Sequence, residues 1–302
     1  MFVQVCVNRA RNVAGKKVGA ATGGIRKFKP AIHYQQAGAV EPARQFSHAD
    51  QRRGTRGKGR CCHPRIIAVV TAAHKSSLQF PMAIDLYWSS GSPFSWRVLL
   101  ALELKGLSYN SHLLHLDLQE QKAPQMLAMN PRGRLPVLRD GDYVVFESVA
   151  VLYYLDRKYP EPPIFGRSAE EGGVILRVID EFQTYTEAEL MRILFSLRSG
   201  SGAAFGERIA HAMHIVAGEA RTIEGRLSKG DWIVGDAVSA ADLAIYPCIR
   251  VLLQELLRPA AQELAARFLP AEIQYPALAR WMRRMEALPG FRKTWPPDWP
   301  QP

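Results

Sequence analysis

The fold of this chain is decided by the stretch NPRGRLPVLRDGDYVVFES, which spans residues 130–148. It contains two short runs of mainly apolar residues, 135–138 and 143–146, which are joined by Asp140-Gly141-Asp142. An Asp-Gly pair between two such runs is a strong signal for a β-hairpin. The apolar segment 149–158 that follows predicts a helix, so the whole stretch predicts two paired strands and then a helix.

Strands and helices also alternate upstream of this hairpin. Residues 84–88 alternate in the manner of a strand, and residues 109–116 are a second candidate strand. Between them, Ser92-Pro93 places serine at an N-cap and proline at the first helical position, which predicts the start of a helix. With a short helix at 125–129, the predicted order is that of a mixed α/β domain.

Downstream of the prolines in residues 160–163, the sequence contains only long helical patterns. The predicted helices cover residues 169–197, 204–228, 239–257 and 276–288. At the start of the third, Ser239-Ala240-Ala241-Asp242 fits a capping box, which we interpret as structural. We therefore expect an α/β domain over residues 82–162 and an all-helical domain over residues 168–295.

Residues 1–81 have a different composition from the rest of the chain. They hold 15 of the 39 Lys and Arg residues but two of the 28 acidic residues, whereas residues 82–302 carry a net charge of −2. Such a segment buries too little apolar surface to offset chain entropy, so we expect it to be disordered. We interpret it as sequence upstream of the natural start, Met82; a targeting peptide and a nucleic-acid-binding arm are the alternatives.

The composition of the remaining chain excludes several classes of protein. No apolar run approaches the length of a membrane span, and the balanced charge gives no reason to expect nucleic-acid binding by the folded body. The four cysteines, Cys6, Cys61, Cys62 and Cys248, do not form a disulfide framework. Since Cys61-Cys62-His63 lacks a second ligand pair at a useful spacing, we expect no metal. The body is predicted to be reduced and cytoplasmic.

Ser92 is the first candidate for chemistry. It lies where the first predicted strand meets the first helix, and a helix N-terminus favours anions through its free N–H groups and partial positive charge. A hydroxyl there can also donate a hydrogen bond to a thiolate, and the two effects together can lower a thiol pKa by about one to two units. An ordinary N-cap is the structural alternative, and Ser89, Ser90 and Ser95 are nearby substitutes.

Two further candidates flank the hairpin. If the Leu135-Pro136 bond is cis, the backbone N–H and C=O of Leu135 can pair with an extended peptide; the alternative is an ordinary trans proline that opens a strand. Glu147-Ser148 begins the next helix and makes either a second anion site, suited to a carboxylate, or a plain cap. Together with Ser92, these features would suit a small peptide that carries a carboxylate and a thiol.

Residues 83–290 resemble the cytosolic glutathione-transferase family, whose first domain is thioredoxin-like. The segment SPFSWRV, residues 92–98, is similar to the active-site segment of the plant tau class and of related bacterial members, and its SWRV part is similar to the zeta class. Residues 130–138, NPRGRLPVL, resemble the family motif Asn-Pro-x-Gly-Lys-Val-Pro-x-Leu. Gly235-Asp236 followed by residues 239–242 resembles the helix-capping motif of the second domain.

This resemblance implies a role for each candidate residue. Ser92 would activate the thiol of glutathione, and Leu135, before the cis-proline Pro136, would pair with the cysteinyl part of the peptide. Arg134 stands where the family usually has the lysine that contacts the glycyl carboxylate, and arginine keeps its charge but not its geometry. The Glu147-Ser148 pair would bind the γ-glutamyl end.

The function implied by the resemblance is that of a glutathione transferase, a homodimer that joins glutathione, its co-substrate, to a small apolar electrophile. A glutathione-dependent cis-trans isomerase of the maleylacetoacetate type and a binding module without chemistry are the alternatives. Glutaredoxins carry Cys-Pro-x-Cys where this chain has serines at positions 92 and 95, so dithiol exchange is excluded at this site. Tyr185, Glu189 and Arg192 are candidates for the pocket of the electrophile.

Overall fold

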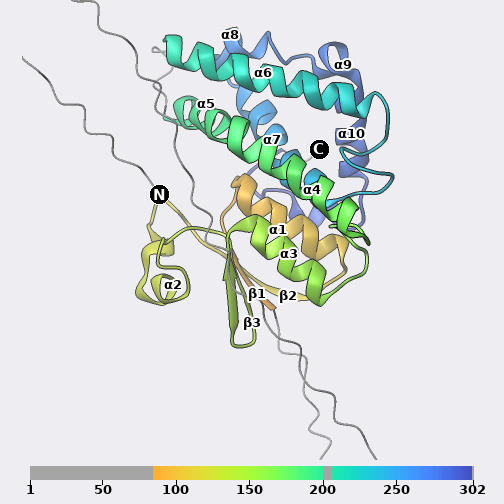
Figure 1. Cartoon of the computed structure of the whole chain (residues 1–302). Helices are drawn as coiled ribbons and strands as arrows, with labels where there is room; N and C mark the ends of the chain where they lie inside the picture. The colour runs from red at the N-terminus through yellow and green to blue at the C-terminus, as the bar shows by residue number, and fades with distance from the viewer. Residues whose placement is uncertain (1–83, 200–205, 301–302) are drawn as a thin grey trace, which may run out of the picture. The chain divides into compact units, whose positions relative to one another are not determined.

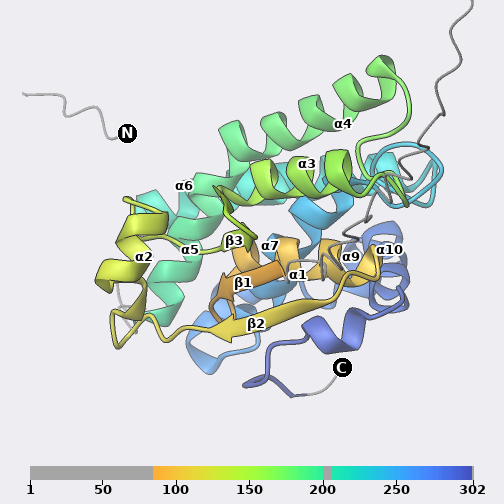
Figure 2. The ribbon, with the colours of Figure 1, turned by 90° about the horizontal axis from the view of Figure 1, so that it is seen from below.

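The computed structural model describes residues 84–199 and 206–300, so the predictions made for residues 1–81 lie outside the described chain. Within these ranges, four strands form one sheet in the order β2-β1-β3-β4. Figure 2 shows β1 between β2 and β3. The strands are β1 (Ile84–Trp88), β2 (Tyr109–Leu113), β3 (Val137–Asp140) and β4 (Tyr143–Phe146). β2 runs parallel to β1, whereas β3 is antiparallel to both β1 and β4. This is the mixed sheet that the predicted order of elements requires.

Two helices pack side by side on one face of this sheet: α1 (Pro93–Leu104) and α3 (Ser148–Lys158) (Figure 1). Successive side chains of a strand point to opposite faces, so Ile84 and Leu86 of β1 share the face that is buried. The short elements η1 (Glu120–Lys122) and α2 (Pro124–Met129) connect β2 to β3. The predicted hairpin forms at Asp140, which pairs with Tyr143.

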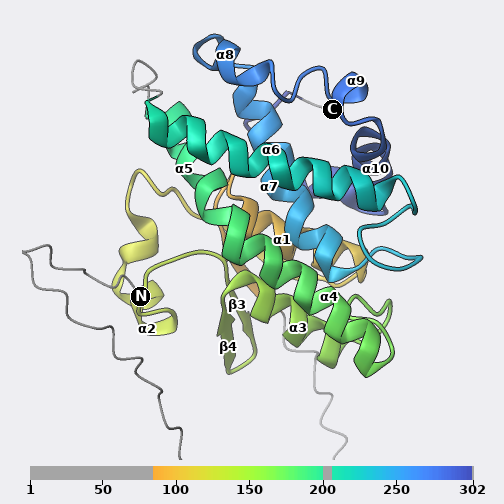
Figure 3. The same ribbon diagram turned by 45° about the horizontal axis from the view of Figure 1, so that its top comes forward.

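The second half of the described chain is helical. Residues 147–199 and 206–300 contain no strand. Its long elements are α4 (Ala169–Phe182), α5 (Ala188–Arg198), α6 (Glu207–Leu227), α7 (Ala240–Leu256) and α10 (Pro276–Glu286). Its short elements are η2 (Gln183–Glu187), η4 (Pro259–Ala261), α8 (Gln262–Ala265), α9 (Ala271–Gln274) and η5 (Phe291–Thr294). α4, η2 and α5 follow one another along a single path (Figure 3), where the sequence predicted one helix, because η2 is a π-helical turn that does not interrupt the helix.

The helix α7 joins the two halves into one hydrophobic core. It packs against α1 on one side and against α4 and α5 on the other, and almost all of its residues are buried. Trp96 of α1 makes edge-to-face contacts with Tyr246 of α7 and with Trp295 near the C-terminus. The predicted fold class, a thioredoxin-like α/β half followed by an all-helical half, is confirmed.

The capping box predicted at the start of α7 is confirmed as well. The Oγ of Ser239 and its backbone N–H both approach Asp242, whose carboxylate accepts them at 2.8 and 2.9 Å. Two other donors from distant parts of the chain, the N–H of Ile233 and the indole of Trp281, also reach this carboxylate. Asp242 therefore caps α7 and also connects it to the segment at Ile233 and to α10 at Trp281.

On the sheet face opposite α1 and α3, Asp85 is the centre of a polar cluster. Its carboxylate accepts hydrogen bonds from Arg139 at 2.8 Å, from His112 at 2.8 Å and from Asn110 at 3.1 Å. Burial by itself would raise the pKa of Asp85, but the bonds from His112, Arg139 and Asn110 lower that pKa to about 2. A carboxyl group with a depressed pKa stabilises the folded state above its unfolded pKa, and this contribution is lost as the pH falls through about 2.

We therefore expect Asp85→Asn to lower the free energy of unfolding by about 2 kcal/mol at pH 7 and by much less at pH 2. Urea denaturation at a series of pH values measures the difference. Glu161, which pairs with Arg167 on the surface, supplies the control, since Glu161→Gln should change stability little at any pH. A loss for Asp85→Asn that is the same at pH 7 and pH 2 would contradict the interpretation.

Within the described ranges, no helix combines the length and the apolar character that crossing a membrane requires.

Candidate functional site

The strand register brings three of the predicted segments to one end of the sheet. Tyr87, near the end of β1, is paired with Val137 at the start of β3, and Val137 is paired with Phe146 at the end of β4. Three segments therefore lie at that end of the sheet: the turn that leads from β1 to Ser92, the Leu135-Pro136 dipeptide before β3 and the Glu147-Ser148 pair after β4. The sequence alone could not establish this, because register depends on the pairing of distant strands.

Ser92 is the N-cap of α1. Its Oγ accepts a hydrogen bond from the N–H of Ser95 at 3.4 Å, and Pro93 occupies the first helical position. The side chain is only partly buried, and no described residue accepts a hydrogen bond from its hydroxyl. The capping role and a role as donor are therefore compatible, since capping uses the oxygen and leaves the hydrogen free.

The neighbouring serines differ from Ser92 in exposure. Ser95 is fully buried and its Oγ accepts from the N–H of Ser89 at 3.3 Å. Ser89 is itself buried, whereas Ser90 is partly exposed. Of the three substitutes considered from the sequence, Ser90 has the most accessible position.

The Leu135-Pro136 peptide bond is cis. Pro136 is buried, Leu135 is partly exposed, and neither the N–H nor the C=O of Leu135 is hydrogen bonded to another described residue. Asn130 holds the preceding turn: it is 2% exposed, its amide donates to the carbonyl of Arg134 at 2.9 Å, and its Oδ1 accepts from the N–H of Arg132 at 3.1 Å. This explains in physical terms why an asparagine opens the segment 130–138.

Arg134 has an exposed side chain, and the structure assigns it no side-chain partner among the described residues. Its carbonyl is held by Asn130, so the backbone of the turn is defined while the guanidinium extends into solvent. The suggested contact with a glycyl carboxylate stays a prediction.

The Glu147-Ser148 pair occupies an unusual piece of backbone. Glu147 has φ 68° and ψ 111°, a combination that a residue other than glycine rarely adopts, and its exposed carboxylate lies 4.0 Å from the Nε of Arg132. Ser148 is the first residue of α3 and is 7% exposed, with its Oγ accepting from Nη1 of Arg97 at 3.2 Å. Residues in such strained conformations cluster at binding sites, because the surrounding structure must hold them there.

Two parts of this region were missed by sequence reasoning. Arg97 is completely buried and contacts Ser148; its signal in the sequence was a charged residue between the apolar residues Trp96 and Val98. The C-terminal segment also reaches the region, where Thr294 and Pro296 border the same small hollow as Ser92. The indole of Trp96 donates to the Oγ1 of Thr294 at 2.8 Å, which fixes this segment against α1. No local pattern predicts a contact over 198 residues.

The role of the cleft residues suggested from the sequence stays a prediction. Tyr185 is 70% exposed and borders a surface hollow lined by residues of α4 and η2 alone. Glu189 and Arg192 pair with each other at 2.8 Å along α5. None of these contacts connects them to Ser92.

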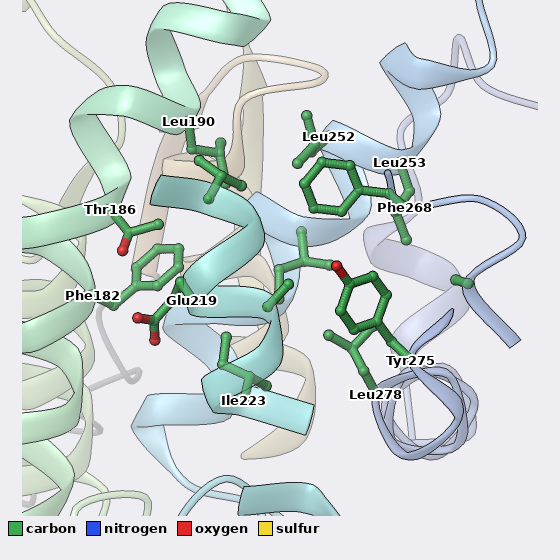
Figure 4. Close-up of a pocket in the computed structure, with 14 residues that line it drawn as sticks. Phe182, Thr186, Leu190, Glu219, Ile223, Leu252, Leu253, Phe268, Tyr275 and Leu278 are labelled. Carbon is green, nitrogen blue, oxygen red and sulfur yellow. The ribbon is translucent and has the colours of Figure 1, made fainter. Parts of the chain in front are cut away.

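A small cavity lies elsewhere, among the helices of the second half (Figure 4). Its volume is about 20 Å³, and apolar side chains such as Phe182, Leu252 and Phe268 line it. Glu219 borders it, and burial raises the pKa of that carboxyl group. A cavity of this size holds about one water molecule, so it cannot contain a peptide.

The described residues provide neither a reactive thiol nor a metal site. Cys248 is fully buried in α7, and burial, opposed by Arg97, raises the pKa of its thiol to about 12. Cys6, Cys61 and Cys62 lie outside the described ranges. Between residues 84 and 300, apart from 200–205, no group of His, Cys, Asp and Glu side chains is arranged to hold a metal ion.

The fold and the site geometry define a class: a thioredoxin-like domain with a cis-proline beside a helix N-terminus, followed by a helical domain. Comparison with known families agrees with this class. The family described as "Glutathione S-transferase, N-terminal domain" matches residues 86–163, and "Glutathione S-transferase, C-terminal domain" matches residues 193–289. The chain belongs to the glutathione S-transferase family.

Individual relatives extend over most of the described chain. "Glutathione S-transferase A" of Pleuronectes platessa is 30% identical over 229 residues, which cover 72% of this chain and 92% of the relative. "Probable maleylacetoacetate isomerase" of Vibrio cholerae is 29% identical over 71% of this chain and 95% of that protein. A glutathione transferase family member from Pseudomonas fluorescens, whose crystal structure has two glutathione molecules bound, shares the fold with a TM-score of 0.62 at 22% identity, over 72% of this chain and 94% of that one.

Proposed function

We propose that this protein is a glutathione transferase in which Ser92 activates the thiol of glutathione for conjugation to a small apolar electrophile. Family membership supports the reaction and glutathione as co-substrate. The single observation that supports the serine assignment is the free, partly exposed hydroxyl of Ser92 at the N-terminus of α1. This hydroxyl lies at the same end of the sheet as the cis-proline. In this respect the protein would be of the serine type, with an active-site segment close to that of the tau class.

Glutathione would lie across this end of the sheet in an extended conformation. The free N–H and C=O of Leu135 suit antiparallel pairing with the cysteinyl residue, which would direct the sulfur toward Ser92. The γ-glutamyl carboxylate would meet the N-terminus of α3 at Ser148, while the carboxylate of Glu147 is available for the γ-glutamyl ammonium group. Arg134 would be close enough to the turn to meet the glycyl carboxylate.

The protein's main chemical contribution to the reaction is to stabilise the thiolate of glutathione. The thiol of bound glutathione gives up its proton to solvent, and the hydroxyl of Ser92 and the N-terminal end of α1 stabilise the sulfur anion that remains. A lone pair of this anion attacks the electrophilic carbon, so the carbon–sulfur bond forms while the leaving group on that carbon, chloride in the case of chlorodinitrobenzene, departs with the electron pair of the bond that breaks. Binding both reactants in one site supplies the remaining acceleration through proximity. No cysteine is needed, in agreement with the unreactive Cys248.

A glutathione-dependent isomerase is the second candidate. It is favoured by the similarity to the probable maleylacetoacetate isomerase of Vibrio cholerae and by the Ser95-Trp96-Arg97-Val98 segment. In that reaction the thiolate would add to a cis double bond and leave after rotation, so the same site would serve both activities. A binding module without chemistry is the third.

We expect the full chain to bind glutathione resin and to conjugate glutathione with chlorodinitrobenzene, measured by the absorbance of the product. Isomerisation of maleylacetoacetate without conjugation would favour the second candidate, and binding without either reaction would favour the third. A chain that neither binds glutathione nor reacts with it would contradict the proposal. Denatured protein and buffer with glutathione alone provide the background rates.

We also propose a cytoplasmic homodimer, on the basis of the family. Sedimentation equilibrium of the full chain measures the oligomeric state directly. A monomer at micromolar concentration would contradict this part of the proposal.

A further inference from the structure

Arg198, the last residue of α5, connects the helical half to the turn that precedes Ser92. Its Nη2 donates to the carbonyl of Gly91 at 3.2 Å, and its Nε donates to Oε1 of Glu255 in α7 at 2.8 Å. Gly91 is the residue before Ser92, so the guanidinium lies beside the serine that would activate the thiol. The two contacts cross 107 and 57 residues, so no local pattern in the sequence singled out this arginine.

The guanidinium of Arg198 is held in place and yet remains accessible. Its side chain is 34% exposed, whereas Glu255, which holds it from α7, is 5% exposed. A guanidinium has five N–H hydrogens, and the two hydrogen bonds use the one on Nε and one of the two on Nη2. Nη1 has no partner among the described residues. Arg198 therefore presents free donors in a fixed position, and a ligand that accepts from them does not have to order the side chain first.

The positive charge of Arg198 is only partly neutralised. Glu255 also pairs with Arg258, whose Nε lies 2.6 Å from its Oε2. Two positive charges and one negative charge leave this cluster with a net charge of +1. Asp298 borders a hollow together with Glu255 and Arg258 but not with Arg198, and it forms no ion pair within the described ranges. The cluster can therefore accept an anion, and the free donors of Arg198 are the groups that would bind it.

An anion at Arg198 would belong to the second substrate. The two carboxylates of glutathione are assigned above to Ser148 and Arg134, which leaves Arg198 available for the electrophile. The electrophilic carbon has to come within about 3–3.5 Å of the sulfur that Ser92 holds, so the substituents of the electrophile lie near the same turn. A planar carboxylate on the electrophile can accept two parallel N–H bonds from a guanidinium, which a neutral substituent cannot match.

We propose that Arg198 determines the specificity for the second substrate: its free N–H groups bind a carboxylate of the electrophile, so the preferred substrates are small electrophiles that carry an acidic group. This inference rests on the proposed function, because it places the electrophile against the thiolate of glutathione at Ser92. The reaction itself is unchanged. The sulfur forms its bond to the electrophilic carbon, the leaving group departs with its electron pair, and the carboxylate of the electrophile takes no part in the bond changes.

The test compares two substrates of different charge in the full chain, chlorodinitrobenzene and 4-chloro-3,5-dinitrobenzoate, both of which lose chloride to the thiolate. Each kcat/KM is divided by the rate constant of the uncatalysed reaction of glutathione with the same substrate, so that intrinsic reactivity cancels. We expect the unaltered chain to favour the benzoate about tenfold and Arg198→Met to lose this preference. Arg258→Met is the matched control, because it removes the other partner of Glu255 but no donor beside Ser92, and it should change the preference by less than about twofold.

A ratio of two substrates within one variant cancels any loss of stability or of glutathione binding, because both reactions share these losses. The unaltered chain gives a second measurement, which stays decisive if Arg198→Met does not fold. Raising the salt concentration from about 20 mM to about 500 mM should lower the preference about threefold or more, since salt screens a partly exposed charge.

A preference that salt does not change would overturn the proposal. An Arg198→Met variant that keeps the preference would overturn it as well, and so would an equal loss in Arg258→Met. Conjugation of chlorodinitrobenzene by an unaltered chain that does not favour the benzoate overturns this inference alone. An unaltered chain that conjugates neither substrate overturns the proposed function together with this inference.

Discussion

Replacing Ser92 with alanine is expected to slow conjugation about 10- to 100-fold at pH 6.5 and to shift the pH–rate profile upward by about one to two units. A free thiol has a pKa of about 8.5, so without a donor most bound glutathione stays protonated at that pH. The free hydroxyl hydrogen of Ser92 at the N-terminus of α1 is the donor that the variant loses. At pH 9 and above the rate should recover, because the thiolate then forms without help.

The control variants separate this effect from a loss of structure. Ser92→Ala also removes an N-cap, which costs about 1 kcal/mol of stability and leaves the protein folded. Ser92→Thr keeps a hydroxyl and should retain most of the activity. If Ser92→Ala keeps its activity at pH 6.5 while Ser90→Ala loses it, the role belongs to Ser90 instead.

Replacing Asp242 with alanine is expected to lower the free energy of unfolding by about 3–5 kcal/mol. The carboxylate is completely buried and accepts from four donors: Ile233 N–H at 3.0 Å, Ser239 N–H at 2.9 Å, Ser239 Oγ at 2.8 Å and Trp281 Nε1 at 2.8 Å. Burial raises the pKa of Asp242, and all four of these donors oppose the shift. The variant leaves several buried donors without a partner, and each such group costs about 1–3 kcal/mol.

A second capping box in the same chain supplies the matched control. Ser168 and Glu171 form it at the start of α4, but there the glutamate is exposed to solvent. Glu171→Ala should therefore cost about 1 kcal/mol or less, since water can satisfy the donors it releases. Urea denaturation of both variants gives the comparison, and equal losses for Asp242→Ala and Glu171→Ala would contradict the account based on burial.

The sequence predicted the individual elements of this fold well where neighbouring residues determine them. The strand at 84–88, the hairpin at 140–143 and the N-cap at Ser92 depend on backbone preferences and on hydrogen bonds within three or four residues. The strand predicted at 135–138 begins at Val137 instead, because Pro136 has no N–H to donate to a strand ladder. Likewise β2 ends at Leu113 rather than at residue 116.

The arrangement of residues that are far apart in the sequence could not be predicted and is seen only in the folded chain. Arg97 contacts Ser148 across 51 residues and Glu187 across 90, and the C-terminal Thr294 reaches Trp96 across 198. These contacts arise from the packing of α7 between the two halves and from the strand register, both of which depend on the whole core. A local pattern records a residue's own conformational preference, but the partner of a buried charge is chosen by the elements that pack around it.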